Sequence, residues 1–177
     1  MKFKTIASVL TSVFVIGLLA LPASAQDSSN RVNTETDWSV FVEDNPTQCW
    51  IVSAPKSIRN IRGGTEVEAV RGDIRLFVSY WPGDDKKGEV SATGGYPYAD
   101  GSTVTIQIGS DTFEMFTGGE LAWAASPTDD ARIIASMKRG AQALVTGRSS
   151  RGTRTEDTFS LLGFTAAVTD AESRCGG

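Results

Sequence analysis

The side chains most often used in catalysis are scarce in this sequence of 177 residues, and histidine is absent. The absence of histidine excludes Ser-His-Asp and Cys-His catalysis and removes the commonest metal ligand. Two pairs of adjacent aspartates are the remaining candidates, Asp84-Asp85 and Asp129-Asp130. Adjacent carboxylates are typical of a turn or of the start of a helix, so neither pair predicts a metal site or a glycosidase centre.

Serine offers no alternative nucleophile. Ser149 and Ser150 lie in the segment GRSSRG, which differs from the GxSxG turn of the serine hydrolases and contains no general base. The glycines form neither a dinucleotide-binding motif nor a P-loop. We therefore predict that the protein is not an enzyme and has no catalytic residue, no cofactor and no metal.

Three arginines surround one turn, at Arg148, Arg151 and Arg154. Their planar guanidinium groups are suited to binding a carboxylate or a phosphate. The simpler interpretation is a solvated hairpin tip, and both interpretations remain open.

Aromatic residues form a second candidate binding surface, because they are enriched in protein interfaces. The candidates are Tyr80, Trp81, Tyr96 and Tyr98. Half-buried core or turn packing is the simpler explanation for them.

The two cysteines are Cys49 and Cys175. In an oxidising compartment, two thiols in one small domain usually pair. We expect a disulfide that joins the first strands to the C-terminus. The alternative is a pair of free thiols that lie too far apart to bridge.

Residues 1–25 have the pattern of a secretory signal peptide. Lys2 and Lys4 form a basic start, residues 6–21 are apolar, and small residues precede position 26. The apolar run is shorter than the roughly 20 residues that a transmembrane helix needs. We therefore predict cleavage between Ala25 and Gln26 and a periplasmic, secreted or cell-surface location.

The rest of the chain has the size of one domain. Residues 26–36 are polar and are expected to form a flexible lead-in to a single domain over residues 37–177. The net charge is −4 at pH 7, and loss of Lys2 and Lys4 makes the exported form more acidic. This charge gives no support to nucleic-acid binding. After the signal peptide, no apolar run is long enough to cross a membrane.

Short segments of alternating apolar and polar residues dominate this domain. The clearest are residues 38–42 and 74–80, and roughly nine to eleven such strands can be placed. Residues 126–140 form an amphipathic helix, for which Gly140 would provide a left-handed end. The apolar face of this helix is Ile133, Ile134 and Met137. We predict a mainly β fold, an antiparallel β-sandwich or flattened barrel with one amphipathic helix and a short C-terminal helical segment.

Several short motifs follow one another in a fixed order. They are DWSV at 37–40, Cys49, FEMF at 113–116 followed by Gly119 and Ala122-Trp123, MKRG at 137–140 and LLGFTAA at 161–167. With the signal peptide, this ordered set resembles the invasion-associated locus B family of exported α-proteobacterial proteins. The resemblance implies a β-rich exported domain without known catalytic activity, and a role in host-cell invasion in pathogenic members.

The family resemblance supplies no catalytic residues. Other members often carry more cysteines, including one near the position of Val42. We therefore predict an exported, non-enzymatic envelope protein that acts by contact with an envelope or host-surface protein. The alternative is a periplasmic module that binds a small ligand or anion through Arg148, Arg151 and Arg154.

Overall fold

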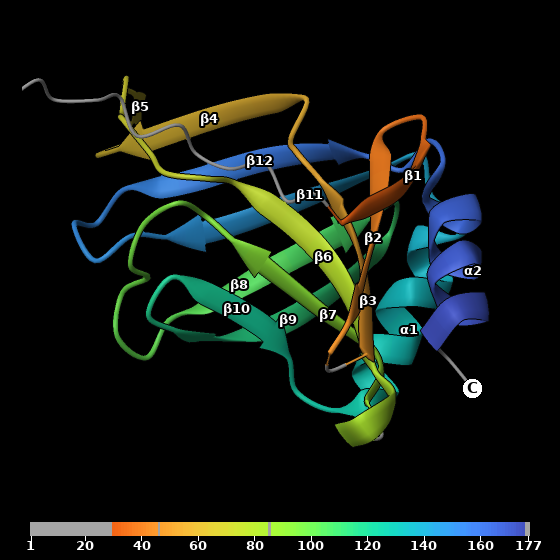
Figure 1. Cartoon of the computed structure of the whole chain (residues 1–177). Coiled ribbons are helices and arrows are strands. Elements are labelled where there is room, and N and C mark those ends of the chain that lie inside the picture. The colour runs from red at the N-terminus through yellow and green to blue at the C-terminus, as the bar shows by residue number, and fades with distance from the viewer. Residues whose placement is uncertain (1–29, 46, 85, 176–177) are drawn as a thin grey trace, which may run out of the picture.

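The computed structural model describes residues 30–45, 47–84 and 86–175. The predicted signal peptide, with its cleavage site between Ala25 and Gln26, lies outside these residues. The described chain forms one curled antiparallel sheet, with two helices side by side at one end of it (Figure 1). The prediction of a mainly β, antiparallel fold is confirmed.

The sheet has twelve strands in the order β1-β2-β3-β6-β7-β10-β9-β8-β11-β12-β4-β5. The strands are β1 Arg31–Glu35, β2 Trp38–Asp44, β3 Thr47–Ser53, β4 Ser57–Arg62, β5 Thr65–Glu66, β6 Arg75–Trp81, β7 Lys86–Thr93, β8 Thr103–Ile108, β9 Asp111–Gly118, β10 Leu121–Ala124, β11 Gln142–Arg148 and β12 Arg154–Ser160. A 3-10 turn, Pro82–Asp84, joins β6 to β7. The terminal strands β1 and β5 do not pair with each other, so within the described residues this is one open sheet that curls, not a closed barrel.

Alternating side chains place one face of the sheet in the core. Trp38 and Val40 on β2 point inward, and so do Leu76 and Val78 on β6. These positions are spaced two apart, as the pleat of a strand requires. Burial of such apolar surface supplies about 25 cal/mol per Å² and is the main source of stability in the fold.

Helix α1, Pro127–Met137, covers one edge of this core. Its N-cap is Ser126, whose side chain accepts a hydrogen bond from the backbone N–H of Asp129 at 3.2 Å. The predicted apolar face, Ile133, Ile134 and Met137, is buried. The buried carboxylate of Asp130 accepts a hydrogen bond from the backbone N–H of Val90 at 2.8 Å, which fixes α1 to β7.

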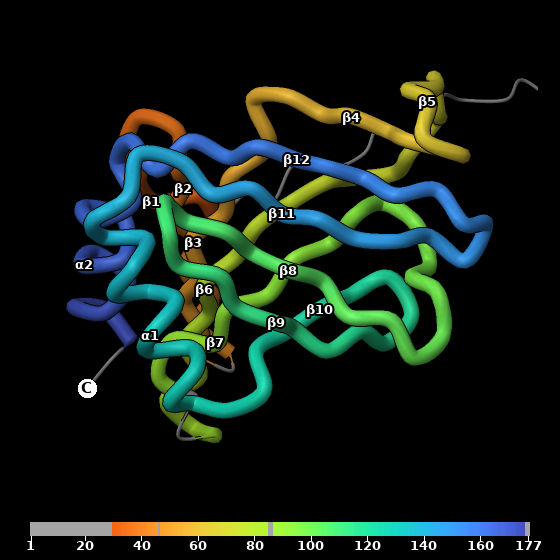
Figure 2. Tube along the Cα trace, turned by 180° about the vertical axis from the view of Figure 1, so that it is seen from behind, coloured from red at the N-terminus to blue at the C-terminus, as the bar shows by residue number. Residues whose placement is uncertain are grey.

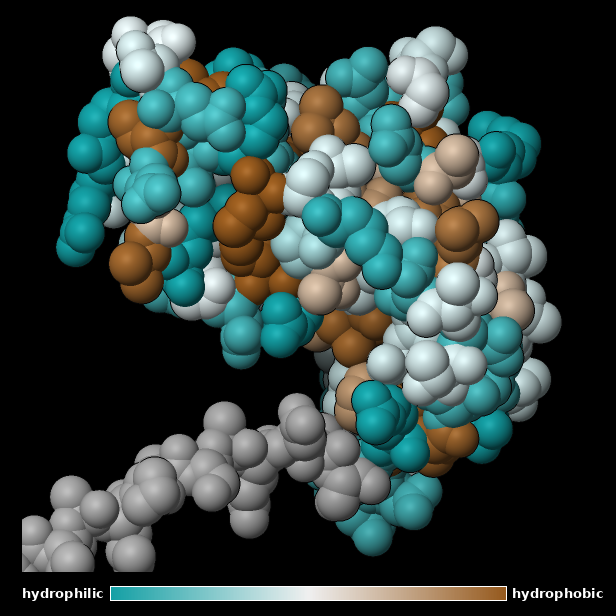
Figure 3. All heavy atoms as spheres, turned by 90° about the horizontal axis from the view of Figure 1, so that it is seen from above, coloured by the Kyte–Doolittle hydropathy of each residue, from teal (hydrophilic) through white to brown (hydrophobic). Residues whose placement is uncertain are grey.

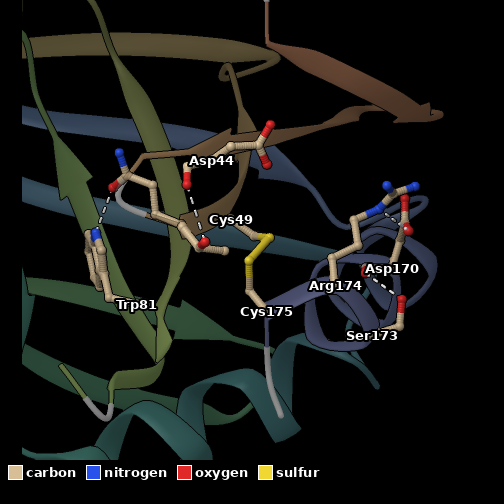
Figure 4. The surroundings of a disulfide bond; sticks show 9 residues. Asp44, Cys49, Trp81, Asp170, Ser173, Arg174 and Cys175 are labelled. Carbon is tan, nitrogen blue, oxygen red and sulfur yellow. Dashed lines mark hydrogen bonds and ion pairs between the residues drawn. A yellow bond between two sulfur atoms is a disulfide. The ribbon is translucent and has the colours of Figure 1, made fainter. Parts of the chain in front are cut away.

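Helix α2, Phe164–Cys175, is one residue longer than α1, so the C-terminal segment is a full helix and not a short one. The Phe164 ring meets the Trp38 ring edge-on, with 4.9 Å between the centroids. Cys175 at the end of α2 forms a disulfide with Cys49 on β3, with 5.9 Å between their Cα atoms (Figure 4). The bond fastens the C-terminal helix to the first half of the sheet.

The end of α1 differs from the sequence prediction. Gly140 lacks a positive φ, so the predicted left-handed conformation is wrong. A Cβ atom at this position would collide with Ile108 and Leu161. Glycine is required here by close packing between the helix end and the sheet, not by backbone conformation.

Candidate functional site

The turn between β11 and β12 lies at the end of the sheet that is opposite the helices (Figures 1 and 2). Arg148 and Arg154 are directly opposite each other in this hairpin, and Arg151 lies at its tip. All three arginines are exposed, and Arg154 forms a 2.7 Å ion pair with Glu156. The turn is held by a hydrogen bond from the Ser149 N–H to the carbonyl oxygen of Thr153 at 2.9 Å.

The structure divides the three arginines between two hollows. Arg148 and Arg154 line a shallow hollow beside Gly63 and Gly64. Arg151 lines a different, more enclosed hollow of about 280 Å³. The turn alone therefore does not gather the three guanidinium groups at one point.

We call this second cavity the arginine hollow. Its walls come from the end of β4, the segment before β6, the loop before β8 and the β11–β12 turn. The lining residues used below are Arg62, Ala69, Val70, Arg71, Tyr96, Pro97, Glu120, Ser150, Arg151 and Thr153. Arg62 donates from Nε and Nη2 to the hydroxyl of Thr153, at 3.1 and 2.7 Å. This pair of bonds holds the Arg62 guanidinium beside the tip that carries Arg151.

A buried ion pair lies beside the hollow. The Arg71 guanidinium donates to both carboxylate oxygens of Asp157, at 2.7 and 2.6 Å, and also to the carbonyl oxygen of Gly94 at 2.8 Å. Burial raises the pKa of Asp157, and the hydrogen bonds and charge of Arg71 oppose that rise. The pair pins the irregular segment 67–74 to β12, so this wall of the hollow is rigid and close to neutral.

Three of the four aromatic residues proposed from the sequence belong to packing. Tyr80 and Tyr98 are buried in the core, and burial raises the pKa of both hydroxyls. Tyr96 packs edge-on against Tyr98, with 5.1 Å between ring centroids, and its hydroxyl shares a 2.5 Å hydrogen bond with Thr155. Trp81 differs, because it lies on the other face of the sheet, where its indole N–H donates to Gln48 at 2.7 Å.

The face of the sheet opposite the core carries a band of aromatic side chains, which we call the aromatic face. It consists of Phe41, Trp50, Phe77, Trp81, Phe116, Leu121 and Trp123. Phe41 is opposite Trp50 in the strand register, and their rings stack with 5.3 Å between centroids. Trp123 is opposite Phe116, which extends the band across β10 and β9.

Part of this band encloses a shallow hollow of about 420 Å³ whose lining includes Trp50, Phe77, Trp81, Leu121 and Trp123. The sequence analysis identified only Trp81 among them. The signal was present in the alternation of β10, where Ala122 and Ala124 point inward and Leu121 and Trp123 point outward. What the sequence does not contain is the strand order, which brings β3, β6, β7 and β10 together.

Comparison with solved structures shows the same fold. A crystal structure of invasion associated protein B from Bartonella henselae is similar, with a TM-score of 0.53 and 14% sequence identity. The match covers 80% of this chain and 95% of that chain. No curated protein matches the sequence.

A family profile described as "Invasion associated locus B (IalB) protein" matches residues 38–172. The chain belongs to the invasion associated locus B family. The resemblance found in the sequence motifs is confirmed. In this family member, no helix within the described residues is long and apolar enough to cross a bilayer. The same residues contain no group of three or more potential metal-binding side chains.

Proposed function

We propose that this invasion associated locus B protein is an exported, non-enzymatic envelope protein that acts by contact with another protein through its aromatic face. The observation that carries the proposal is the outward placement of large apolar side chains. Phe116, Leu121 and Trp123 are 54%, 47% and 37% exposed. Contiguous apolar surface of this kind is typical of an interaction site.

The composition of the aromatic face also fits a protein partner. Three of the four tryptophans of the chain lie on it, and the fourth, Trp38, is buried. Tryptophan is enriched among the residues that dominate binding energy in interfaces. Gln48, Glu89 and Ser91 lie among the rings and give this face a polar component. We expect an envelope or host-surface protein that presents apolar side chains to this face.

Export of the protein rests on the predicted signal peptide and on the family resemblance. The Cys49–Cys175 disulfide supports it, because such bonds persist in oxidising compartments and are rare in the cytosol. Mass spectrometry of the envelope protein should find Gln26 as the first residue. An envelope form that retains residues 1–25 would contradict the proposal.

The contact function is tested with a double variant, Leu121→Ser with Trp123→Ser, in envelope crosslinking followed by mass spectrometry. We expect the variant to remain folded and to lose its crosslinked partner, because truncation of a tryptophan anchor such as Trp123 costs about 2 kcal/mol or more of binding free energy. The matched control is Leu162→Ser, which removes an apolar side chain that is 62% exposed but lies outside the aromatic face. Retention of every partner by the folded double variant would refute the proposal.

A further inference from the structure

We infer that the arginine hollow binds a small molecule that carries a phosphate group. This activity is separate from the contact function of the aromatic face. The inference rests on the presence of both Arg62 and Arg151 in the lining of one half-open hollow. The two residues come from different elements, since Arg62 ends β4 and Arg151 lies at the tip of the β11–β12 hairpin.

The Arg62 side chain is already oriented for binding. Its Nε and Nη2 atoms both donate to Thr153, which fixes the plane of the guanidinium. Nη1 has no hydrogen-bond or ion-pair partner within the described part of the chain, so its two N–H groups are available to an acceptor in the hollow. A guanidinium that is held in place before binding loses less conformational entropy when a ligand arrives.

The hollow has a net positive charge. The charge of Arg71 is balanced by Asp157, so Arg71 contributes rigidity and little net charge. Arg62 and Arg151 remain as two cations, and Glu120 is the one carboxylate among the residues that line the hollow. The local charge is thus opposite in sign to the net charge of −4 on the whole chain.

These features favour a phosphate monoester over a simple carboxylate. Glu120 offsets one of the two cations, so the number of acceptor atoms and not net charge alone distinguishes the ligands. A phosphate monoester carries about −1.5 to −2 charges and three acceptor oxygens at neutral pH and can accept from both guanidinium groups, whereas a carboxylate has one charge and two oxygens. The apolar wall consists of the exposed residues Ala69, Val70 and Pro97 and of the half-buried ring of Tyr96. A volume of about 280 Å³ accommodates the phosphate and a small organic group attached to it.

Isothermal titration calorimetry of the oxidised protein at low ionic strength tests the proposal, with phenyl phosphate, inorganic phosphate and benzoate as probes. We expect phenyl phosphate to bind more tightly than either of the others, because it uses both the cations and the apolar wall. Arg151→Gln and Arg62→Gln should each weaken binding about tenfold, the usual consequence of losing one charged hydrogen-bonding group. Glu120→Gln should strengthen it.

The matched control is Arg148→Gln, which removes the same charge from the same hairpin but lines the other hollow. It should leave the affinity for phenyl phosphate within about twofold of wild type, since only screened long-range attraction is lost. An equal loss in Arg148→Gln and Arg151→Gln would overturn the site, and so would the absence of binding at millimolar phenyl phosphate. Benzoate binding as tightly as phenyl phosphate would overturn the assignment to phosphate.

The two arginine variants differ in their effect on the fold. Arg62→Gln removes the bonds to Thr153 and can lower stability, whereas Arg151 has no hydrogen-bond or ion-pair partner within the described residues. Arg151→Gln therefore measures the loss of ligand binding without a loss of stability.

Discussion

Arg71 and Asp157 are 86 residues apart in the chain, yet their side chains are only 4% and 3% exposed and meet through two short hydrogen bonds. Removing two charges from water is costly, and their attraction compensates only when the remaining hydrogen-bonding groups are also satisfied. The bond from Arg71 to Gly94 and the contact of its guanidinium with the Tyr96 ring, at 5.0 Å, contribute to this. The pair therefore holds one wall of the arginine hollow in place.

Replacement of Arg71 by methionine should destabilise the protein by about 3–5 kcal/mol at neutral pH, because Asp157 would be left as an unpaired buried carboxylate. Burial already raises the pKa of Asp157, and loss of Arg71 should raise it further. A raised pKa means that the folded state binds the proton more tightly, so stability falls as pH rises through that pKa. The deficit of the variant should accordingly shrink in acid, where Asp157 is protonated.

Urea unfolding of wild type and Arg71→Met, at neutral pH and at a series of acidic pH values, measures this change in the stability deficit. The double variant Arg71→Met with Asp157→Leu is the control, since it removes both charges and should recover part of the lost free energy. A deficit of the single variant that is independent of pH would show that Asp157 does not cause it.

Single residues of the site were only partly predictable. Arg151 was identified because it lies in a turn with two other arginines. Arg62 and Arg71 gave no such signal, since each is an isolated cation and its role depends on which strand it faces. The partners of both, Thr153 and Asp157, are 91 and 86 residues away in the chain, and side-chain pairing at that distance is determined by the tertiary fold.

At the scale of elements, α1 shows how far local pattern reaches. The spacing of Ile133, Ile134 and Met137 predicted the buried face, and the structure places all three in the core. Ile134→Asp would bury a carboxylate without a partner, and we expect a loss of several kcal/mol of unfolding free energy or failure to fold. Thermal unfolding followed by circular dichroism measures this.

The control for Ile134→Asp is the neighbouring variant Ala135→Asp, which introduces the same charge on the exposed side of the same helix. It should change stability by roughly 0.5 kcal/mol or less, as exposed substitutions usually do. Similar melting temperatures for the two variants would mean that α1 does not dock through Ile134.

Strands were predictable where one face is buried, as in β2 and β6, because burial imposes the alternation. Strand β4, Ser57–Arg62, was missed because Ser57, Ile58 and Arg59 are all exposed and the residue that points inward is a polar one, Asn60. Strand β1, Arg31–Glu35, lies where the sequence suggested a flexible lead-in. It too lacks the apolar alternation of a core strand, because none of its residues is fully buried. Its pairing with β2 supplies the order that its own residues do not specify.

Helix α2 carried a readable signal that the sequence analysis did not use. Its buried residues recur at helical spacing and are Phe164, Ala167, Val168, Ala171 and Cys175. Threonine and valine within the segment lower its intrinsic helix propensity, so local preference alone favours a shorter helix than the one observed. Packing against β2 and β3 favours the longer one.

At the scale of the whole molecule, the two proposed activities use different residues. The helices and the disulfide occupy one end, and the β11–β12 turn with the arginine hollow occupies the other (Figure 1). Seen from above, apolar residues are interspersed with polar ones, and the outline is indented on the side away from the helices (Figure 3). Glu120 of the hollow and Leu121 of the aromatic face are consecutive residues, but the two linings share no residue. The two proposals can therefore be tested with separate variants.

The disulfide acts on the whole chain, because its sequence separation of 126 residues closes most of the domain into a loop. A cross-link over so long a loop restricts the unfolded chain, and removing a native disulfide typically costs about 2–5 kcal/mol. We expect Cys49→Ser to lose stability in this range and to show a larger dependence of unfolding free energy on urea, because its unfolded state exposes more surface.

Urea unfolding separates this effect from damage to the core around Cys49. Cys175→Ser breaks the same bond from the other end, and the double variant breaks it without leaving a free thiol. If the cross-link is what matters, all three should be equally destabilised, and reduced wild type should match them. Each variant should also be insensitive to reductant, because none retains a bond to reduce. Oxidised wild type with the stability of the double variant would show that the bond contributes nothing. Helix α2 would then be held by the packing of its buried residues and by polar contacts such as that of Asp170 with Asn33.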